Sequence, residues 1–238
     1  MLNVIKVKDK VEGNLKAHDI LKDILDSQTL LAFSGGTSPN YISMIVEPGD
    51  ILPGAICVVD ERYGDEFHEN SNELLLKNAG VLEFAQNNNI EFYKVLSGKS
   101  FDATGEDYDQ MISELLPKFP KRVGVMGIGS NLHTAGIFPN SLAAHSPNFV
   151  VGEEVEEKQS LRSSPAERDA GLKFPQRITL TLRTLGEFQA FVILAFGDEK
   201  KEALKKMLDK NENDMQKFPA IFYRKSPAKA YLITDQQI

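Results

Sequence analysis

Unbroken apolar runs recur along the chain, and stretches with helical periodicity separate them. A run of this kind, without polar alternation, is typical of a strand covered on both faces, as in a parallel sheet. The runs are TLLAF (29–33), AICVVD (55–60), IEFYKV (90–95), RVGVMG (122–127), FQAFVILAF (188–196) and KAYLIT (229–234). Their alternation with helices predicts a single α/β domain over residues 1–238, a doubly wound, mostly parallel sheet flanked by helices.

Two of the intervening stretches have an amphipathic helical stripe. In residues 14–28 the stripe consists of Ile20, Leu21, Ile24 and Leu25. In residues 198–210 it consists of Ala203, Leu204, Met207 and Leu208. Asp198 is expected to cap the second helix. The most polar stretch, residues 153–171, is expected to be a solvated loop, with a mobile lid over a site as the alternative.

Composition and charge argue against some classes of ligand and favour one cellular compartment. The net charge of −7 argues against a nucleic-acid surface, which needs a broad basic field, but a small anion needs only two or three cations. The single cysteine, Cys57, can form no internal disulfide, which favours a reducing cytoplasm. No apolar run reaches the roughly 18–20 residues that span a bilayer. The first residues do not have the pattern of a secretory signal.

Ligands of doubly wound folds bind beyond the carboxyl ends of the strands, so the residues after each run are the candidates. The first run is followed by Ser34, Gly35, Gly36, Thr37 and Ser38. Thr37 or Ser38 can cap a following helix, and Pro39 suits its first turn. Exposed backbone N–H groups and hydroxyls would then bind an anion, although a tight turn without a ligand fits equally well. The turn is neither a Walker loop nor a nucleophile elbow.

The second run leads directly into Asp60-Glu61-Arg62. Asp60 and Arg62 point the same way if this segment is extended, because side chains alternate along a strand. Such a pair suits one group that holds a hydroxyl or a histidine and another that meets an anion. A solvated, charged loop start is the alternative. Ser71 and Asn72 then begin the next predicted helix.

The fourth run is followed by GIGSNLHTAGIFP, which contains His133. This histidine is either a general base at a strand end or a residue that fills space in a turn. We expect it near the start of a helix, where the helix dipole would lower its pKa and keep the imidazole neutral, as a base requires. Leu132 replaces the third glycine of G-x-G-x-x-G, which argues against a dinucleotide site, and no residue spacing suggests a metal site.

Arg177 and Lys200 also lie beside strand ends, the first at the start of RITLTL and the second after AFG. Either residue taken alone reads as an ordinary surface cation. Their place at the expected edge of the sheet is the reason to include them among candidate ligand-binding residues.

Together these segments resemble the 6-phosphogluconolactonase family, a branch of the glucosamine-6-phosphate isomerase superfamily. The matching segments are SGGTSP for the family's S-G-G-S-T-P, DER followed by SN, GIGSNLHTAGIFPNS for G-M-G-x-D-G-H-T-A-S-L-F-P-G-S, RITLTLRTL, GDEK and PAIFYRKSPAKAYLITD. They occur in the family's order over nearly the whole chain. The resemblance implies a modified Rossmann-like fold and hydrolysis of 6-phosphoglucono-δ-lactone in the oxidative pentose phosphate pathway, without metal or organic cofactor. We expect a monomer or homodimer.

The resemblance also implies a role for each candidate. His133 would be the general base that activates water, and Asp60 would orient polar groups. Arg62, Arg177 and Lys200 would hold the phosphate together with the backbone of the SGGTSP turn. Asn131 stands where the family has aspartate and can orient the imidazole as a hydrogen-bond acceptor.

The chain also departs from the family pattern. Asn131 and Leu132 replace Asp-Gly, and asparagine cannot stabilise an imidazolium by charge. A sugar-phosphate-binding protein with weak or no activity is therefore one alternative. The other is a glucosamine-6-phosphate isomerase or deaminase. Those enzymes have tyrosine where this chain has Arg62 and glutamate where it has Phe138, so both positions favour the lactonase.

Overall fold

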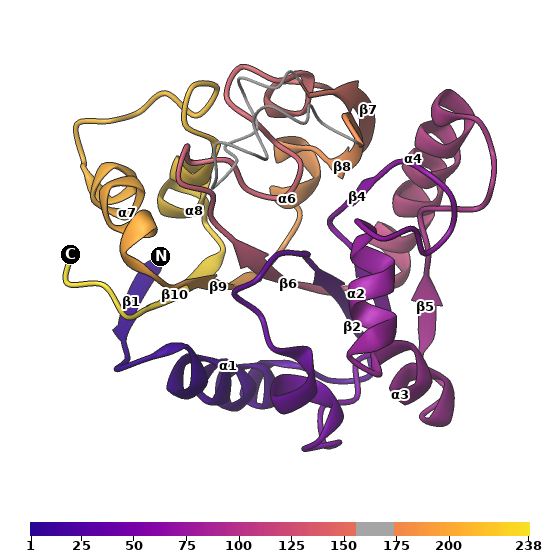
Figure 1. Ribbon diagram of the computed structural model, residues 1–238, viewed down its shortest axis with the longest axis horizontal. Coiled ribbons are helices and arrows are strands. Elements are labelled where there is room, and N and C mark those ends of the chain that lie inside the picture. The colour runs from indigo at the N-terminus through magenta and orange to yellow at the C-terminus, as the bar shows by residue number, and fades with distance from the viewer. Residues whose placement is uncertain (156–173) are drawn as a thin grey trace.

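The computed structural model describes residues 1–155 and 174–238, and its centre is a sheet of seven strands (Figure 1). Across the sheet the strands are β1 (Leu2–Lys6), β10 (Lys229–Thr234), β9 (Ala190–Ala195), β6 (Lys121–Gly127), β2 (Thr29–Phe33), β3 (Ala55–Val58) and β5 (Glu91–Tyr93). Every neighbouring pair is parallel. The predicted mostly parallel α/β sheet is confirmed, and each apolar run named above contributes a strand to it.

A second, smaller sheet was not predicted. It consists of three antiparallel strands in the order β4 (Asp60–Arg62), β8 (Gln176–Leu180) and β7 (Val150–Glu154). The chain passes from one sheet to the other at Val59, whose N–H donates to Phe33 and whose carbonyl accepts from Leu180. The smaller sheet is thus an addition to the predicted one, and the run 55–60 contributes a strand or its first residue to each of the two.

The helices are α1 (Lys10–Ile24), α2 (Asn72–Asn78), α3 (Val81–Asn87), α4 (Phe101–Lys118), α6 (Leu182–Leu185), α7 (Lys201–Leu208) and α8 (Phe222–Lys225). Short turns complete them: a π-helical turn at Ile42–Val46 and 3₁₀ turns at Leu142–Ala144, Asp198–Lys200 and Pro219–Ile221. Figure 1 shows α1 on one side of the central sheet and α7 and α8 on the other. Among these helices none has both the length and the apolar character needed to cross a membrane.

The predicted helical stripes face the core, but one predicted cap is wrong. Ile20 and Leu21 in α1 are buried. The buried residues of α7 are Ala203, Leu204 and Met207. Asp198 does not cap α7, because Gly197, at a φ of 95°, leads into a 3₁₀ turn and α7 begins only at Lys201.

Part of the polar stretch 153–171 also differs from the prediction. Residues 153 and 154 end strand β7, so the stretch does not begin as a loop. Residues 156–171 lie outside the described part of the chain.

The strand order locates the point at which the winding of the central sheet reverses. From β2 the chain adds β3 and β5 on one side, and from β6 it adds β9 and β10 on the other. Because the direction of winding reverses between β2 and β6, their following loops diverge and leave a crevice at the carboxyl ends. The loop after β2 begins at Ser34, and the loop after β6 contains His133.

Candidate active site

A cavity of about 230 Å³ lies at this switch point. It is lined by Ser34, Gly35, Gly36, Thr37, Ser38, Pro39, Asp60, Arg62, Asn72, Gly127, Ile128, Gly129, His133, Ala135 and Lys200. The segments that follow β2, β6 and β9 therefore meet strand β4 and the start of α2 here, and most of the candidate residues from the sequence line the cavity. Asn131 and Arg177 do not line the cavity.

The glycine turn after β2 has an unusual backbone and one unpaired hydroxyl. Gly36 adopts a φ of 91°, a conformation that favours glycine. At Gly35 a Cβ atom would come within 1.8 Å of the Asn72 side chain, so only glycine fits. The Oγ of Ser34 is buried and has no hydrogen-bond partner among the described residues. A buried hydroxyl without a partner costs free energy, which a ligand at this wall would recover.

The segment after the turn differs from the helix that the sequence predicts. Residues Ile42–Val46 form a π-helical turn without a side-chain cap, so neither Thr37 nor Ser38 caps a helix here. The buried Asn14 of α1 holds this segment instead. Its Oδ1 accepts from the N–H of Asn40 at 2.7 Å, and its Nδ2 donates to the carbonyl of Ser38 at 3.2 Å.

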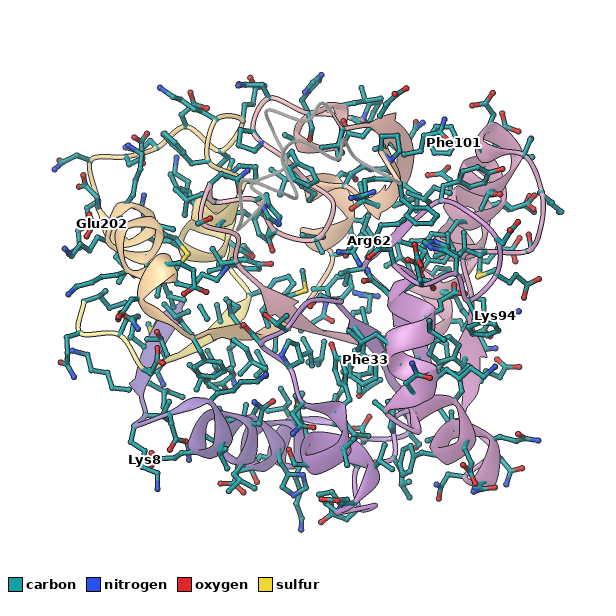
Figure 2. The ribbon with its side chains drawn as sticks, in the orientation of Figure 1. Lys8, Phe33, Arg62, Lys94, Phe101 and Glu202 are labelled. Atoms are coloured by element: carbon teal, nitrogen blue, oxygen red, sulfur yellow. The ribbon has the colours of Figure 1, made fainter. Side chains whose placement is uncertain are left out.

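Strand β4 presents Asp60 and Arg62 to the cavity, as alternation along an extended segment predicts. Figure 2 places Arg62 beside the start of α2. Its Nη1 donates to the carbonyl of Asn70 at 3.0 Å and to Oδ1 of Asn72 at 2.6 Å. Burial raises the pKa of the Asp60 carboxyl, and the guanidinium groups of Arg62 and Arg177 oppose that rise.

Glu61, between them, faces away from the cavity and is fully buried. Its Oε1 accepts from the backbone N–H groups of Arg62 and Asn72, and its Oε2 accepts from the N–H of Glu73 and the hydroxyl of Ser71. A carboxylate at the start of a helix satisfies N–H groups that have no partner within the helix. Glu61 is thus a structural link between β4 and α2.

The imidazole of His133 is held on two sides. Its Nδ1 lies 2.5 Å from Oδ1 of Asn131, which also accepts from the His133 backbone N–H at 3.1 Å. Its ring stacks on Phe138 with centroids 4.6 Å apart. Because Oδ1 can only accept, Nδ1 carries the proton, and the lone pair is on Nε2. Nε2 has no hydrogen-bond partner among the described residues, so it is available to a ligand or water.

The environment keeps this imidazole neutral. Burial, and after it the positive charges of Lys200, Arg62 and Arg177, together lower the pKa of His133 to about 4. The expected cause, a helix N-terminus, is wrong, because residues 130–140 form turns and a single β-bridge rather than a helix. The neutral state follows instead from burial and from the neighbouring cations.

The backbone around His133 is tightly constrained. Leu132 adopts a φ of 67°, and its side chain is buried in the core rather than in the cavity wall. The left-handed conformation costs a non-glycine residue roughly 1 kcal/mol, which burial of the leucine can offset. The close approach occurs at Gly129, where a Cβ atom would lie 2.1 Å from Nδ1 of His133. Glycine at position 129 therefore makes room for the imidazole.

Two cations approach the site differently. Lys200 follows β9 and lines the cavity directly. Arg177 lies opposite Arg62 in the antiparallel pair of strands β8 and β4, and it is 8% exposed. Its Nη1 donates to the carbonyls of Phe174 and Gln176, and its charge acts on Asp60 and His133. Arg177 thus contributes to the electrostatics of the site from behind the wall.

Asn72 is the residue in the cavity wall whose importance the sequence did not indicate. The SN dipeptide that follows DER marked it only as a helix start, and no local pattern relates it to Arg62, ten residues earlier. Among the residues that the structure describes, no group of three or more His, Cys, Asp or Glu side chains could hold a metal ion.

Residues 14–232 match a family model described as glucosamine-6-phosphate isomerases/6-phosphogluconolactonase. The chain belongs to this family. A glucosamine-6-phosphate deaminase of Lactococcus lactis subsp. cremoris is 27% identical over 214 residues, 87% of this chain and 86% of its own. A 6-phosphogluconolactonase of Pseudomonas aeruginosa is 34% identical over 117 residues, 48% of each chain.

The fold is also that of solved family structures. The structure of a 6-phosphogluconolactonase from Trypanosoma cruzi superposes with a TM-score of 0.76, at 19% identity over 98% of this chain and 94% of the other. The chain is thus a member of a superfamily of sugar-phosphate enzymes, and the family description names two activities. The residues that line the cavity bear on which of the two this chain has.

Proposed function

We propose that this protein hydrolyses 6-phosphoglucono-δ-lactone to 6-phosphogluconate, a step of the oxidative pentose phosphate pathway. The main support for this proposal is that the neutral imidazole of His133 lines the same cavity as Arg62 and Lys200. One wall thus offers a base, and another offers positive charge for a phosphoryl group. A δ-lactone phosphorylated at its far end requires both.

In the proposed reaction Nε2 of His133 takes a proton from a water molecule as its oxygen attacks the lactone carbonyl carbon. The tetrahedral intermediate then expels the ring oxygen, which takes that proton from the imidazolium and becomes a hydroxyl. The product is the open-chain acid, which ionises. Asn131 keeps the proton on Nδ1, so that Nε2 is the basic atom in every cycle.

The phosphoryl group would anchor the substrate at Arg62, Lys200 and the Ser34–Ser38 turn. Binding energy from this remote group holds the lactone carbon beside the base, which converts a bimolecular encounter into a positioned one. The same anion would also offset cations that lower the pKa of His133. Substrate binding should therefore make the imidazole a stronger base than it is in the free protein.

The alternative activity in the family is isomerisation with deamination of glucosamine 6-phosphate. The resemblance assigns a glutamate of those enzymes to the position of Phe138, and here that side chain is an uncharged ring stacked on His133. Arg62 occupies the position of their tyrosine. Both differences favour hydrolysis, although the Lactococcus relative is named a deaminase.

The experiment is a direct comparison of the two activities of the purified protein. We expect accelerated acid release from freshly made 6-phosphogluconolactone and no ammonia release from glucosamine 6-phosphate. Ammonia release without lactone hydrolysis would contradict the proposal. A protein that binds 6-phosphogluconate but is inert with both substrates would be a sugar-phosphate-binding protein.

A further inference from the structure

The side chain of Asn72 contacts three parts of the cavity wall at once. Its Nδ2 donates to the backbone carbonyl of Asp60 at 2.7 Å, and its Oδ1 accepts from Nη1 of Arg62 at 2.6 Å. The same amide lies against Gly35, where a Cβ atom would clash with it. Asn72 is 1% exposed, so these contacts are made in a water-poor environment. It joins the glycine turn, β4 and α2.

Glu61 fixes the position from which Asn72 acts. Its carboxylate accepts from the backbone N–H of Asn72 at 2.7 Å and from that of Glu73 at 2.8 Å. The hydroxyl of Ser71 donates to the same carboxylate and caps the N–H of Leu74. The first turn of α2 is thus bonded to β4, and the amide of Asn72 has little freedom to move.

This network occupies one side of the Arg62 guanidinium and leaves another side unoccupied. Nη1 is bonded to Asn70 and Asn72, whereas Nε and Nη2 have no partner among the described residues. Nε–H and Nη2–H form the edge with which arginine binds a phosphoryl or carboxylate group through two parallel hydrogen bonds.

We propose that Asn72 is a positioning residue that holds Arg62 through Nη1 and thereby keeps its Nε–Nη2 edge available for the phosphoryl group of the substrate. This inference rests on the proposed function, since it takes a sugar phosphate as the ligand. Asn72 acts through Arg62 and not on the lactone carbon.

The chemistry of the amide explains why asparagine suits this position. Its oxygen accepts from a guanidinium while its nitrogen donates to a carbonyl. An aspartate of nearly the same shape would place a carboxylate oxygen against the carbonyl of Asp60 and would neutralise part of the charge of Arg62. Asn72→Asp therefore tests the chemistry of the side chain, whereas Asn72→Ala tests its presence.

The test is a double-mutant cycle on the binding of 6-phosphogluconate, measured by calorimetry. Asn72→Ala should weaken binding by about tenfold, since it removes a hydrogen bond to a charged group, and Asn72→Asp should weaken it at least as much. In an Arg62→Ala background, Asn72→Ala should change affinity by less than about twofold, because its effect passes through Arg62. Asn88→Ala removes an amide that donates to the carbonyl of Phe84 in the preceding helix α3, and it is the matched control.

Kinetics and stability separate positioning from folding. We expect the KM for the lactone to rise in Asn72→Ala while kcat stays within about threefold. Equal losses in both backgrounds, or unchanged affinity in both Asn72 variants, would overturn the inference. Should Asn72→Ala fail to fold, Asn72→Asp, which keeps the volume, decides alone. A protein that hydrolyses no lactone yet obeys the cycle would disprove the proposed function and leave this inference standing.

Discussion

The cavity has two halves that differ in how their polar groups are paired: an anion half with Ser34, Arg62 and Lys200, and a base half around His133. In the anion half, Ser34 Oγ and the Nε–Nη2 edge of Arg62 have no partner among the described residues, and the Nζ of Lys200 has none either. In the base half, Asn131 and Phe138 already hold the imidazole of His133 on two sides. The anion half has several polar groups that a ligand would satisfy, whereas the base half is already oriented and leaves only Nε2 of His133 for a ligand or water.

This difference suggests how binding and reactivity are divided. Unpaired polar groups cost stability in the free protein and recover it when a ligand binds, so the anion half should determine affinity. A base must be oriented before the substrate arrives, so the base half should determine the rate. The halves are coupled by charge, because Lys200 and Arg62 lower the pKa of His133. The following variants test this division.

The largest expected effect comes from the base half. His133→Ala should lower kcat for lactone hydrolysis by roughly 10²–10⁴-fold, the contribution of a general base. Affinity for 6-phosphogluconate should change by no more than about threefold, since the phosphoryl contacts remain. Initial rates and calorimetry measure the two quantities, and His145→Ala, at an exposed histidine, is the control. Loss of affinity as large as the loss of rate would refute the division.

The next effect is on affinity. Lys200→Ala should weaken binding of 6-phosphogluconate by roughly 10–100-fold, because it removes a charge-assisted contact. It should also raise the pKa of His133, because a positive charge beside the imidazole is lost. Calorimetry and NMR titration of the histidine measure both changes. Lys210→Ala, at an exposed lysine, should do neither. Unchanged affinity in Lys200→Ala would remove this residue from the phosphate site.

A charge in the base half should change the pH dependence. Because the pKa of His133 is about 4, the base is neutral above that pH, and kcat/KM should fall only as pH drops through about 4. Asn131→Asp places a negative charge beside the imidazole, which stabilises the imidazolium and should raise this pKa by about 1–3 units. The variant should then lose activity at pH 5, where the wild type retains it.

The measurement for Asn131→Asp is the pH profile of kcat/KM. Asn211→Asp adds the same charge at an exposed position outside the cavity and should leave the profile unchanged. Superimposable profiles for the wild type and Asn131→Asp would show that Asn131 does not control the base.

The smallest effect tests the unpaired hydroxyl of the anion half. Ser34→Ala should stabilise the free protein by up to about 1 kcal/mol, because it removes a buried group without a partner. It should also weaken 6-phosphogluconate binding by roughly 2–10-fold. Thermal melts with and without ligand measure both changes, with Ser97→Ala, at an exposed serine, as the control. A variant that is less stable and binds equally well would contradict the assignment.

Local patterns in the sequence were sufficient for six of the seven strands of the central sheet, all except β1, and for the alternation of Asp60 and Arg62. Both depend on backbone geometry over a few residues: a run without polar positions requires cover on both faces, and side chains in an extended segment alternate. The resemblance to the family then identified most of the residues that line the cavity as one site, including His133 and Lys200.

Other features of the cavity depend on contacts between distant parts of the chain, which local patterns do not report. That Glu61 links β4 to α2, that Asn72 holds Arg62, and that burial beside cations rather than a helix keeps His133 neutral all depend on contacts between different elements. The second sheet likewise forms only because Val59 turns the chain toward β8. Periodicity reports on neighbours along the chain, whereas hydrogen bonds and burial are made by residues that folding brings together, and these determine the chemistry of the cavity.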